Sequence, residues 1–470
     1  MTATHQQASA MTASGARGRR FAAFPHAAVL LLAPVAVVGA AVMLEGTTAE
    51  FREIAPTNVD IRPSVLSGPM LGPADYSAMI KDAERRIALG EERVSRGQGE
   101  WLWAETLAAG LLARFDLAAD YADLARAQQI LADAQALAPR GSGPSLRRAS
   151  SAMKAHDLAL AERQLAVFMG QAVPPSRSDR GEVMAMRGDI AFYRGDQALA
   201  DQLYRRAGEN DPAGDQSWRQ AVLALSRAEY DHAIMSFAQM AGPRATPFTR
   251  ARLALRIGAS ESARGNWGRA LVFYKAADGF FPGYWLTRAH LAEAHALNGD
   301  MAGALSLMTE AAELSDAPEA MDALAMMYRS RGERTQSRAW AERAGAIWQQ
   351  RMQQAPDAAA AHAAEHELVF GSPERAMALA RRNLDARPYG EARLLYANTL
   401  MAVGEIETAR AELAAAERGG WRSAPLYAAM ADVEAMAGDA EAAAKAREQA
   451  LAINPRIFTP EARLAWLGHG

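Results

Sequence analysis

The stretch MAMRGDIAFYRGDQALADQLYRRAGENDP, residues 184–212, decides the fold of this chain. Gly188 stands where a larger side chain would push a partner helix away, and Gly195 can adopt the left-handed backbone that ends a helix. Asp196 can then accept hydrogen bonds from the free N–H groups at the start of the next helix. Two small residues flank Tyr204 on that second helix, Ala200 and Ala207. The stretch therefore predicts two closely packed helices that meet at Gly195 and end at Pro212.

The same pattern recurs along most of the chain. Each copy has a corner residue, usually glycine, and a small residue five positions later, and successive corners lie 33 to 39 residues apart. The eight copies are Gly195/Ala200, Ala228/Ala233, Gly265/Ala270, Gly299/Ala304, Gly332/Ser337, Gly371/Ala376, Gly404/Ala409 and Gly438/Ala443. A period of this length is typical of repeat proteins, in which each unit is one supersecondary element. Helical spacing dominates and strand-like alternation is absent, so we expect an all-α solenoid.

The units resemble the tetratricopeptide repeat family, whose consensus has Gly, Gly, Ala, Tyr, Ala and Pro at fixed places in each unit. The best copies are Gly188, Gly195, Ala200, Tyr204, Ala207, Pro212; Gly258, Gly265, Ala270, Tyr274, Ala277, Pro282; and Tyr427, Gly438, Ala443, Ala450, Pro455. The resemblance covers residues 180–456 as about eight repeats. It implies a right-handed α-solenoid of stacked helix-turn-helix units whose first helices line a concave groove.

The N-terminal region predicts a membrane attachment. Residues 27–44 are 18 residues without a charge, the lower limit for crossing a bilayer, and arginines precede them at positions 17, 19 and 20. We expect residues 1–20 to form a short cytoplasmic tail and residues 21–44 a single-pass transmembrane signal anchor in the inner membrane. The body would then be exported to the periplasm. A cleaved signal peptide, leaving a soluble periplasmic protein, is the alternative.

The remaining boundaries follow from composition. Residues 45–74 are rich in Pro, Gly, Ser and Thr and predict a flexible linker. Residues 75–179 keep some of the repeat's spacing and predict degenerate helical repeats, since the ends of solenoids differ from their middle. Residues 457–470 predict a C-terminal capping helix in which Leu464, Trp466 and Leu467 cover the last repeat.

Composition excludes several classes of function. The chain has 470 residues, no cysteine and a formal net charge of −3, so disulfides, thiolate metal sites and a Cys nucleophile are excluded and no nucleic-acid partner is expected. It contains no P-loop, no Gly-x-Gly-x-x-Gly after a strand and no Gly-x-Ser-x-Gly elbow. We therefore expect no enzyme activity, no cofactor, no catalytic or metal site, and no small-molecule substrate.

One short motif suggests chemistry. The segment HAAEH, residues 362–366, has the H-x-x-E-H order of an inverted zinc-protease motif, with Glu365 placed as a base between His362 and His366. A catalytic zinc also needs a third ligand and a cleft, and neither can be located in the sequence. The competing interpretation is one helix of a repeat, which we favour; the zinc metallopeptidase remains an alternative.

The resemblance also places residues in the groove. By register these are Glu182, Asp189, Phe192, Tyr193, Trp218, Glu293, Asp322, Met326, Arg329, Glu365, Asn398 and Asp432. Acidic and apolar side chains predominate, so we expect a protein partner that presents an apolar and basic segment. The function expected is a non-enzymatic interaction scaffold, in a setting such as the assembly of a cell-envelope complex. A structural spacer without a specific ligand is the other alternative.

Overall fold

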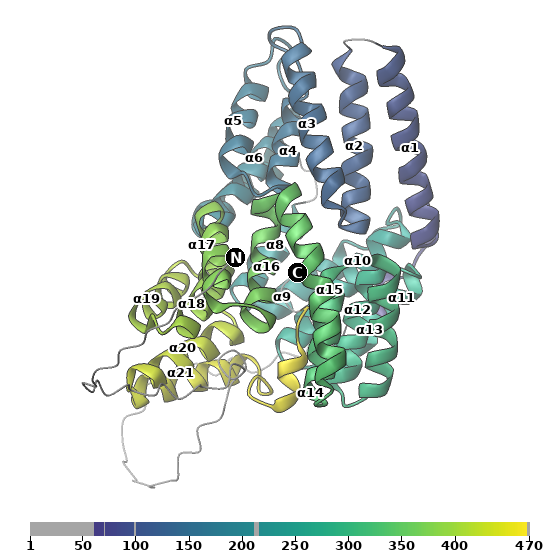
Figure 1. Ribbon diagram of the computed structural model, residues 1–470. Helices are drawn as coiled ribbons and strands as arrows, with labels where there is room; N and C mark the ends of the chain where they lie inside the picture. Colours follow the sequence, from purple (N-terminus) through teal and green to yellow (C-terminus); the bar gives the residue numbers. More distant parts are fainter. Residues whose placement is uncertain (1–60, 70, 98–99, 211–215, 468–470) are drawn as a thin grey trace, which may run out of the picture.

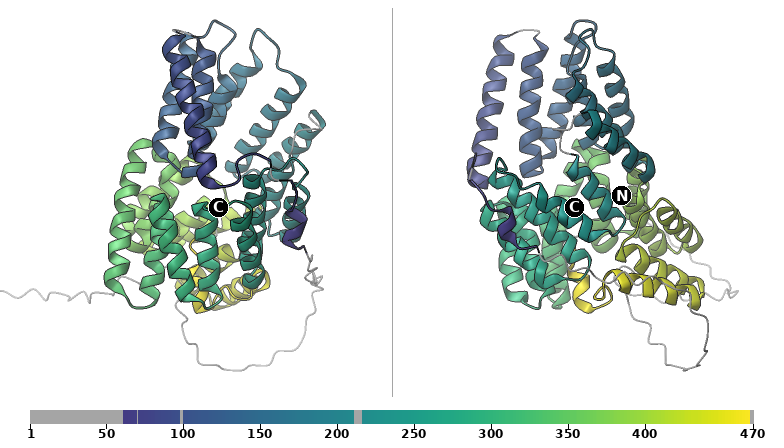
Figure 2. Two further views of the ribbon diagram at one scale, coloured as in Figure 1. Left: turned by 90° about the vertical axis from the view of Figure 1, so that its right-hand side faces the viewer. Right: turned by 180° about the vertical axis from the view of Figure 1, so that it is seen from behind.

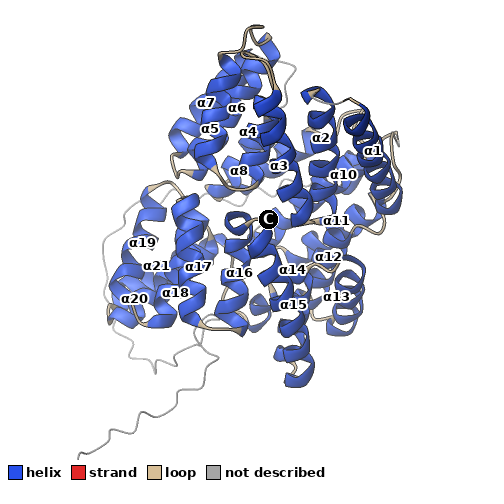
Figure 3. Cartoon of the chain, turned by 45° about the horizontal axis from the view of Figure 1, so that its top comes forward, coloured by secondary structure: helices blue, strands red, loops and turns tan. Residues whose placement is uncertain are grey.

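The computed structural model describes residues 61–69, 71–97, 100–210 and 216–467, and within them every regular element is helical (Figure 3). The elements are η1 (Pro63–Leu66), α1 (Tyr76–Arg96), α2 (Trp101–Ala118), α3 (Tyr121–Leu137), α4 (Ser145–Lys154), α5 (Leu158–Met169), α6 (Arg177–Tyr193), α7 (Gln197–Asn210), α8 (Ser217–Ser226), α9 (Tyr230–Gln239), α10 (Pro247–Ala263), α11 (Trp267–Phe280), α12 (Trp285–Leu297), α13 (Met301–Ser315), α14 (Pro318–Ser330), α15 (Arg334–Gln354), α16 (Pro356–Phe370), α17 (Pro373–Ala386), α18 (Gly390–Val403), α19 (Ile406–Arg418), α20 (Ala424–Ala437), α21 (Ala440–Ile453) and η2 (Pro460–Leu464). The two η elements are 3-10 helices.

The helices pack as consecutive pairs. Eight pairs run from α6–α7 to α20–α21, two more, α2–α3 and α4–α5, precede them, and α1 packs against α2. We number the pairs from α2–α3 as the first to α20–α21 as the tenth. The prediction of an all-α chain built from helix pairs is confirmed.

The corner within a pair has the predicted chemistry. Gly195 has a φ of +83°, and the N–H of Leu199 donates to Asp196 Oδ1 over 2.9 Å. A Cβ at Gly188 would lie 2.5 Å from Tyr204 Cε1, so only glycine allows the two helices of this pair to approach so closely.

Two other corners show how far the pattern holds. Ala228, which replaces glycine, adopts the left-handed conformation with a φ of 58°. Gly371 does not: its φ is −118°, and this corner is formed instead by Ser372, whose side chain accepts from the N–H of Arg375 at the start of α17. Gly371 was therefore correctly placed between helices but wrongly expected to adopt the conformation of the other corners.

The array turns back on itself, and pairs that are six apart touch. Three contacts join a corner within one pair to the chain just before the first helix, or at its start, six pairs later, and a fourth joins the corner of the fifth pair to the residue that ends α21. They are His156 with Asp357, Gly195 with Pro388, Ser226 with Arg422, and Gly265 with Asn454. His156 Nδ1 lies 3.0 Å from the carbonyl of Asp357, and the Arg422 N–H donates to the Ser226 carbonyl over 2.8 Å. The early helices consequently lie at one end of the molecule, over the later pairs (Figures 1 and 2).

The described part of the expected linker is packed rather than flexible. Leu66, on η1, is fully buried in the largest hydrophobic cluster, which is built mainly from α8 to α15. The guanidinium of Arg250 donates to the Leu66 carbonyl, and Arg269 Nη2 donates to the Ile61 carbonyl over 3.2 Å. Leu66 is apolar and packs in the core, and this packing holds the residues on either side of it against the helices.

The C-terminal segment also differs from the expectation. Residues 457–467 contain the short 3-10 helix η2 and no α-helix. Ile457 and Phe458 pack on the last pair, but Leu464 and Leu467 join the central cluster and Trp466 packs against it. In Figure 1 this yellow segment runs back beside α14. It is therefore not a cap over the last repeat.

The predicted cytoplasmic tail, membrane segment and most of the linker lie outside the described residues. Among the helices that the structure does describe, none is both long and apolar enough to cross a bilayer.

Candidate binding groove

The first helices of the pairs form a common surface. They touch one another across pairs, as α4–α6, α10–α12, α12–α14, α16–α18 and α18–α20 do. All predicted groove residues lie on first helices: Glu182, Asp189, Phe192 and Tyr193 on α6, Trp218 on α8, Glu293 on α12, Asp322, Met326 and Arg329 on α14, Glu365 on α16, Asn398 on α18 and Asp432 on α20. We call the surface that carries these residues the first-helix face.

On α6 the two predicted acids share one arginine within the chain. Arg219 Nε donates to both carboxylate oxygens of Asp189 over 3.0 Å, and its Nη2 donates to Glu182 Oε1 over 3.0 Å. The Tyr204 hydroxyl also donates to Asp189, over 3.0 Å. Burial, the largest influence, raises the pKa of Asp189 despite the opposing effect of Arg219. These two carboxylates are therefore not free to attract a basic partner.

Asp322 is likewise held inside the chain. It is 1% exposed, receives the indole N–H of Trp348 over 2.9 Å, and lies 2.7 Å from His366 Nδ1. Burial raises its pKa, while the hydrogen bond from His366 acts in the opposite direction. Met326, one turn along α14, is also buried, at 5% exposure. Both residues act as core, which the groove register did not predict.

The residues of the H-x-x-E-H motif point to separate partners. His366 is paired with Asp322, whereas His362 Nδ1 lies 3.0 Å from Glu365 Oε2 and its ring stacks on Trp348 with centroids 5.7 Å apart. In the described part of the chain, no group of three His, Cys, Asp or Glu residues is placed to hold a metal ion. The geometry gives Glu365 and the two histidines a packing role within α14 to α16.

Glu293 holds the C-terminal segment on the first-helix face. Its Oε2 accepts the backbone N–H groups of Trp466 over 2.6 Å and of Leu467 over 2.7 Å, and Glu293 itself is 2% exposed. The segment's 3-10 helix contacts both α12 and α14, two first helices. A stretch of this chain thus occupies part of the surface that the sequence predicts for a partner.

Aromatic stacking extends this site along α14 and α16. The ring of Trp466 lies 6.0 Å from that of Phe370, and the guanidinium of Arg329 lies 4.7 Å above Phe370. Arg329, an exposed residue, also donates to the Val369 carbonyl over 3.0 Å. Arg329 is therefore the predicted groove residue that stands at the edge of the bound segment.

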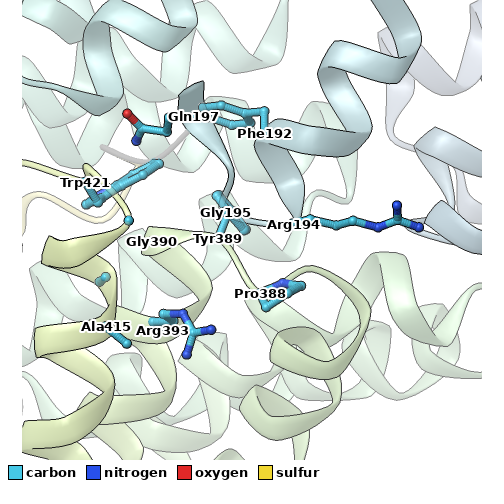
Figure 4. Close-up of a pocket in the computed structure, with 12 residues that line it drawn as sticks. Phe192, Arg194, Gly195, Gln197, Pro388, Tyr389, Gly390, Arg393, Ala415 and Trp421 are labelled. Atoms are coloured by element: carbon cyan, nitrogen blue, oxygen red, sulfur yellow. The ribbon is translucent and has the colours of Figure 1, made fainter. Parts of the chain in front are cut away.

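Phe192, on α6, packs against residues that precede α18 and α20, where one turn of the array meets the next, instead of facing a partner. It is 6% exposed, and its ring lies 6.1 Å from Tyr389 and 6.2 Å from Trp421. Figure 4 shows these residues around a pocket of about 90 Å³, bounded by Gly195 from one turn and Pro388 from the other. Tyr193, half-buried, packs edge-on against Tyr389 with centroids 5.3 Å apart. These aromatic residues contribute to the seam between turns.

Asn398 and Asp432 lie half-buried on α18 and α20, two helices that contact each other. Burial raises the pKa of Asp432 to about 6, and Arg447 moderates this effect. The 3-10 helix η2 contacts α12 and α14, whereas Asn398 and Asp432 lie on α18 and α20.

Sequence reasoning missed the residues that bind the predicted acids. Arg219 lies 37 positions from Glu182, and Trp348 lies 26 positions from Asp322, so periodicity within one unit does not reveal either pair. One signal was present for Arg219, because a basic residue follows Trp218 on a first helix beside the acids of the preceding unit. For the C-terminal segment, no spacing rule connects residue 293 with residue 466.

No protein-family model matches this chain, and no curated protein matches it. Among solved structures, one to which the chain is similar is a tetratricopeptide repeat protein from Parabacteroides merdae. The two share 14% sequence identity with a TM-score of 0.32, over 56% of this chain and 98% of that one.

Proposed function

We propose that this protein is a non-catalytic scaffold that binds a segment of another protein on its first-helix face. One observation carries the proposal: the chain's own C-terminal segment lies there, with two consecutive backbone N–H groups donated to Glu293. A surface that holds a peptide segment within the chain has the chemistry needed to hold one from a partner. Binding of this kind joins backbone hydrogen bonds to apolar contacts.

The bound segment indicates what the partner should present. Leu464 and Leu467 are 7% and 8% exposed, so apolar side chains supply the buried area. The buried carboxylate of Glu293 recognises backbone N–H groups through charge-assisted hydrogen bonds, which are stronger than neutral ones. Because the acids of α6 and α14 are paired within the chain, the expected partner segment is apolar with free backbone donors. A basic side chain is not required by these contacts.

A peptide added in trans tests this proposal. The probe is a fluorescein-labelled peptide with the sequence of residues 456–467, and fluorescence anisotropy measures its binding. The wild-type chain should bind it poorly, because a tethered segment has an effective concentration in the millimolar range. The variant Leu464→Asp/Leu467→Asp loosens the chain's own segment and should bind the peptide at least about tenfold more tightly.

Glu293→Gln, added to the loosened variant, should weaken peptide binding by about tenfold, since it replaces two charge-assisted hydrogen bonds by neutral ones. Glu313→Gln is the matched control, because Glu313 is an exposed acid on the second helix α13. If the loosened variant gains no affinity, or if Glu293→Gln and Glu313→Gln behave alike, the first-helix face is not a peptide site and the spacer alternative is favoured.

We further propose that residues 21–44 anchor the protein in an inner membrane and that the helical body is exported, where it would serve in assembling an envelope complex. The support is the charge-free stretch of residues 27–44 with its preceding arginines. Because the chain has no cysteine, a single Ala444→Cys substitution on exposed α21 gives a clean probe. Labelling of intact cells by a maleimide that cannot cross the inner membrane supports export; labelling only after lysis contradicts it.

A further inference from the structure

Two arginines on α10 share one aromatic platform. The guanidinium of Arg252 lies 4.7 Å from the centroid of the Trp218 ring and that of Arg256 lies 5.5 Å from it. Arg252 also lies 5.7 Å from the ring of Phe248. Cation–π contacts favour each guanidinium separately. The two like charges nevertheless repel each other at this short separation.

No acid compensates this pair. Among the described residues, neither Arg252 nor Arg256 forms a hydrogen bond or an ion pair with a carboxylate, whereas Arg219 on the preceding first helix binds two. Two carboxylates whose charges act on Tyr193, as that of Arg256 does, are engaged elsewhere: Asp189 with Arg219, and Glu391 with the Tyr389 hydroxyl, which donates to it over 3.1 Å. Glu391 attracts Arg256 only through its charge.

A third cation acts on the same tyrosine as Arg256. Arg387 is 7% exposed, and its guanidinium lies 5.0 Å from the Tyr193 ring and 5.2 Å from the Tyr389 ring. Its buried Nε has no hydrogen-bond partner among the described residues. The charges of both Arg256 and Arg387 act on Tyr193, as do those of the carboxylates Asp189 and Glu391. Arg256 and Arg387 therefore both lie within electrostatic range of that ring.

The cluster is surrounded by protein yet open to solvent. Arg256 is half-buried and Arg252 is exposed, although both stand on first helices inside the turn of the array. Burial, followed by repulsion from Arg252, lowers the pKa of Arg256 to about 10. Keeping such cations unpaired costs free energy, because desolvated charge is unfavourable without a partner. An anion supplied from outside would remove that cost.

We propose that Arg252 and Arg256, held on Trp218, form a subsite for an oxyanion, either a phosphate or a carboxylate group of a ligand that enters the first-helix face. The ring of Trp218 holds both guanidiniums by cation–π contact, and a guanidinium can bind two oxygens at once through its N–H groups. The inference does not depend on the C-terminal segment, which is bound by different residues on α12 and α14.

Isothermal titration calorimetry on the full chain tests the subsite with two probes, inorganic phosphate and an acetylated tri-glutamate amide. Arg252→Gln/Arg256→Gln should weaken binding of the accepted probe by at least about tenfold. Arg206→Gln/Arg244→Gln is the charge-matched control, since both of these arginines are exposed. Arg252→Lys/Arg256→Lys keeps the charge without the planar fork and should show an intermediate loss.

The two probes separate the sources of the oxyanion. Binding of phosphate without the peptide assigns the subsite to a phosphate group, binding of the peptide without phosphate assigns it to carboxylates, and either result supports the proposal. Binding of neither probe overturns it, and so does equal weakening in the Arg252/Arg256 and Arg206/Arg244 variants. Circular dichroism of each variant verifies that the helical fold is retained.

Discussion

Gly195 lies at a contact between two pairs that are six apart, so a substitution there measures the contribution of that contact to stability. A side chain there meets two obstacles: the φ of +83°, and the Pro388 carbonyl oxygen, which would lie 2.9 Å from the new Cβ. The left-handed conformation costs a residue with a Cβ about 1–2 kcal/mol. Overpacking against a backbone atom adds about 1–3 kcal/mol. Gly195→Ala should therefore lower the free energy of unfolding by about 2–5 kcal/mol.

Gly404→Ala is the matched control. Gly404 occupies the equivalent corner six pairs later, with a φ of +87° and no atom within 4 Å of the position of a Cβ. Its substitution should cost only the backbone term of about 1–2 kcal/mol. Urea unfolding followed by circular dichroism compares the two variants. An equal loss in both would refute the reasoning, because it would mean that the contact between turns is absent or yields without cost.

Two further substitutions follow from the structure. Gly188→Ala places a Cβ 2.5 Å from Tyr204 Cε1 and should destabilise the chain by about 1–3 kcal/mol. Gly208→Ala places a Cβ on a helix where no atom lies within 4 Å, and it should stabilise the chain by about 0.5–1 kcal/mol. Thermal unfolding that ranks the two variants in the opposite order contradicts the packing of α6 on α7. Burial holds the pKa of Asp432 at about 6, above its ordinary value of 3.8, so its favourable contribution is complete below pH ~4 and is lost as the pH rises through 6. In urea unfolding at pH ~7.5, the free energy of unfolding of Asp432→Asn should thus exceed that of the wild type by about 1–3 kcal/mol, and the two free energies should converge near pH ~4. A difference between them that does not depend on pH would disprove this assignment.

Much of the local structure could be predicted from the sequence. Gly195, Asp196 and Tyr204 specify a corner, a cap and a seam, and each acts through neighbours within one helix pair. Repetition of the pattern then identified all eight pairs from α6 to α21. The location of the candidate groove on first helices was implied by the resemblance to the tetratricopeptide repeat family, carried over by register.

The partners of the groove residues could not be predicted in this way. Asp189 binds Arg219 of the next pair, and Glu293 binds backbone groups more than 170 residues away. Contacts between pairs depend on the rotation from one pair to the next, which accumulates from small packing differences along the array. The identity of a single residue does not reveal that rotation.

The sequence by itself determined the class of fold, the number of repeated pairs and the helix of each pair on which a residue lies. These properties depend on local backbone preferences and on side-chain spacing within about one helix pair. The tertiary structure alone decided that pairs six apart touch, that the acids of the first-helix face are engaged, and that residues 464–467 lie against α12 and α14. The physical reason is that long-range packing sums many small rotations, so it brings together residues whose separation in the chain carries no signal.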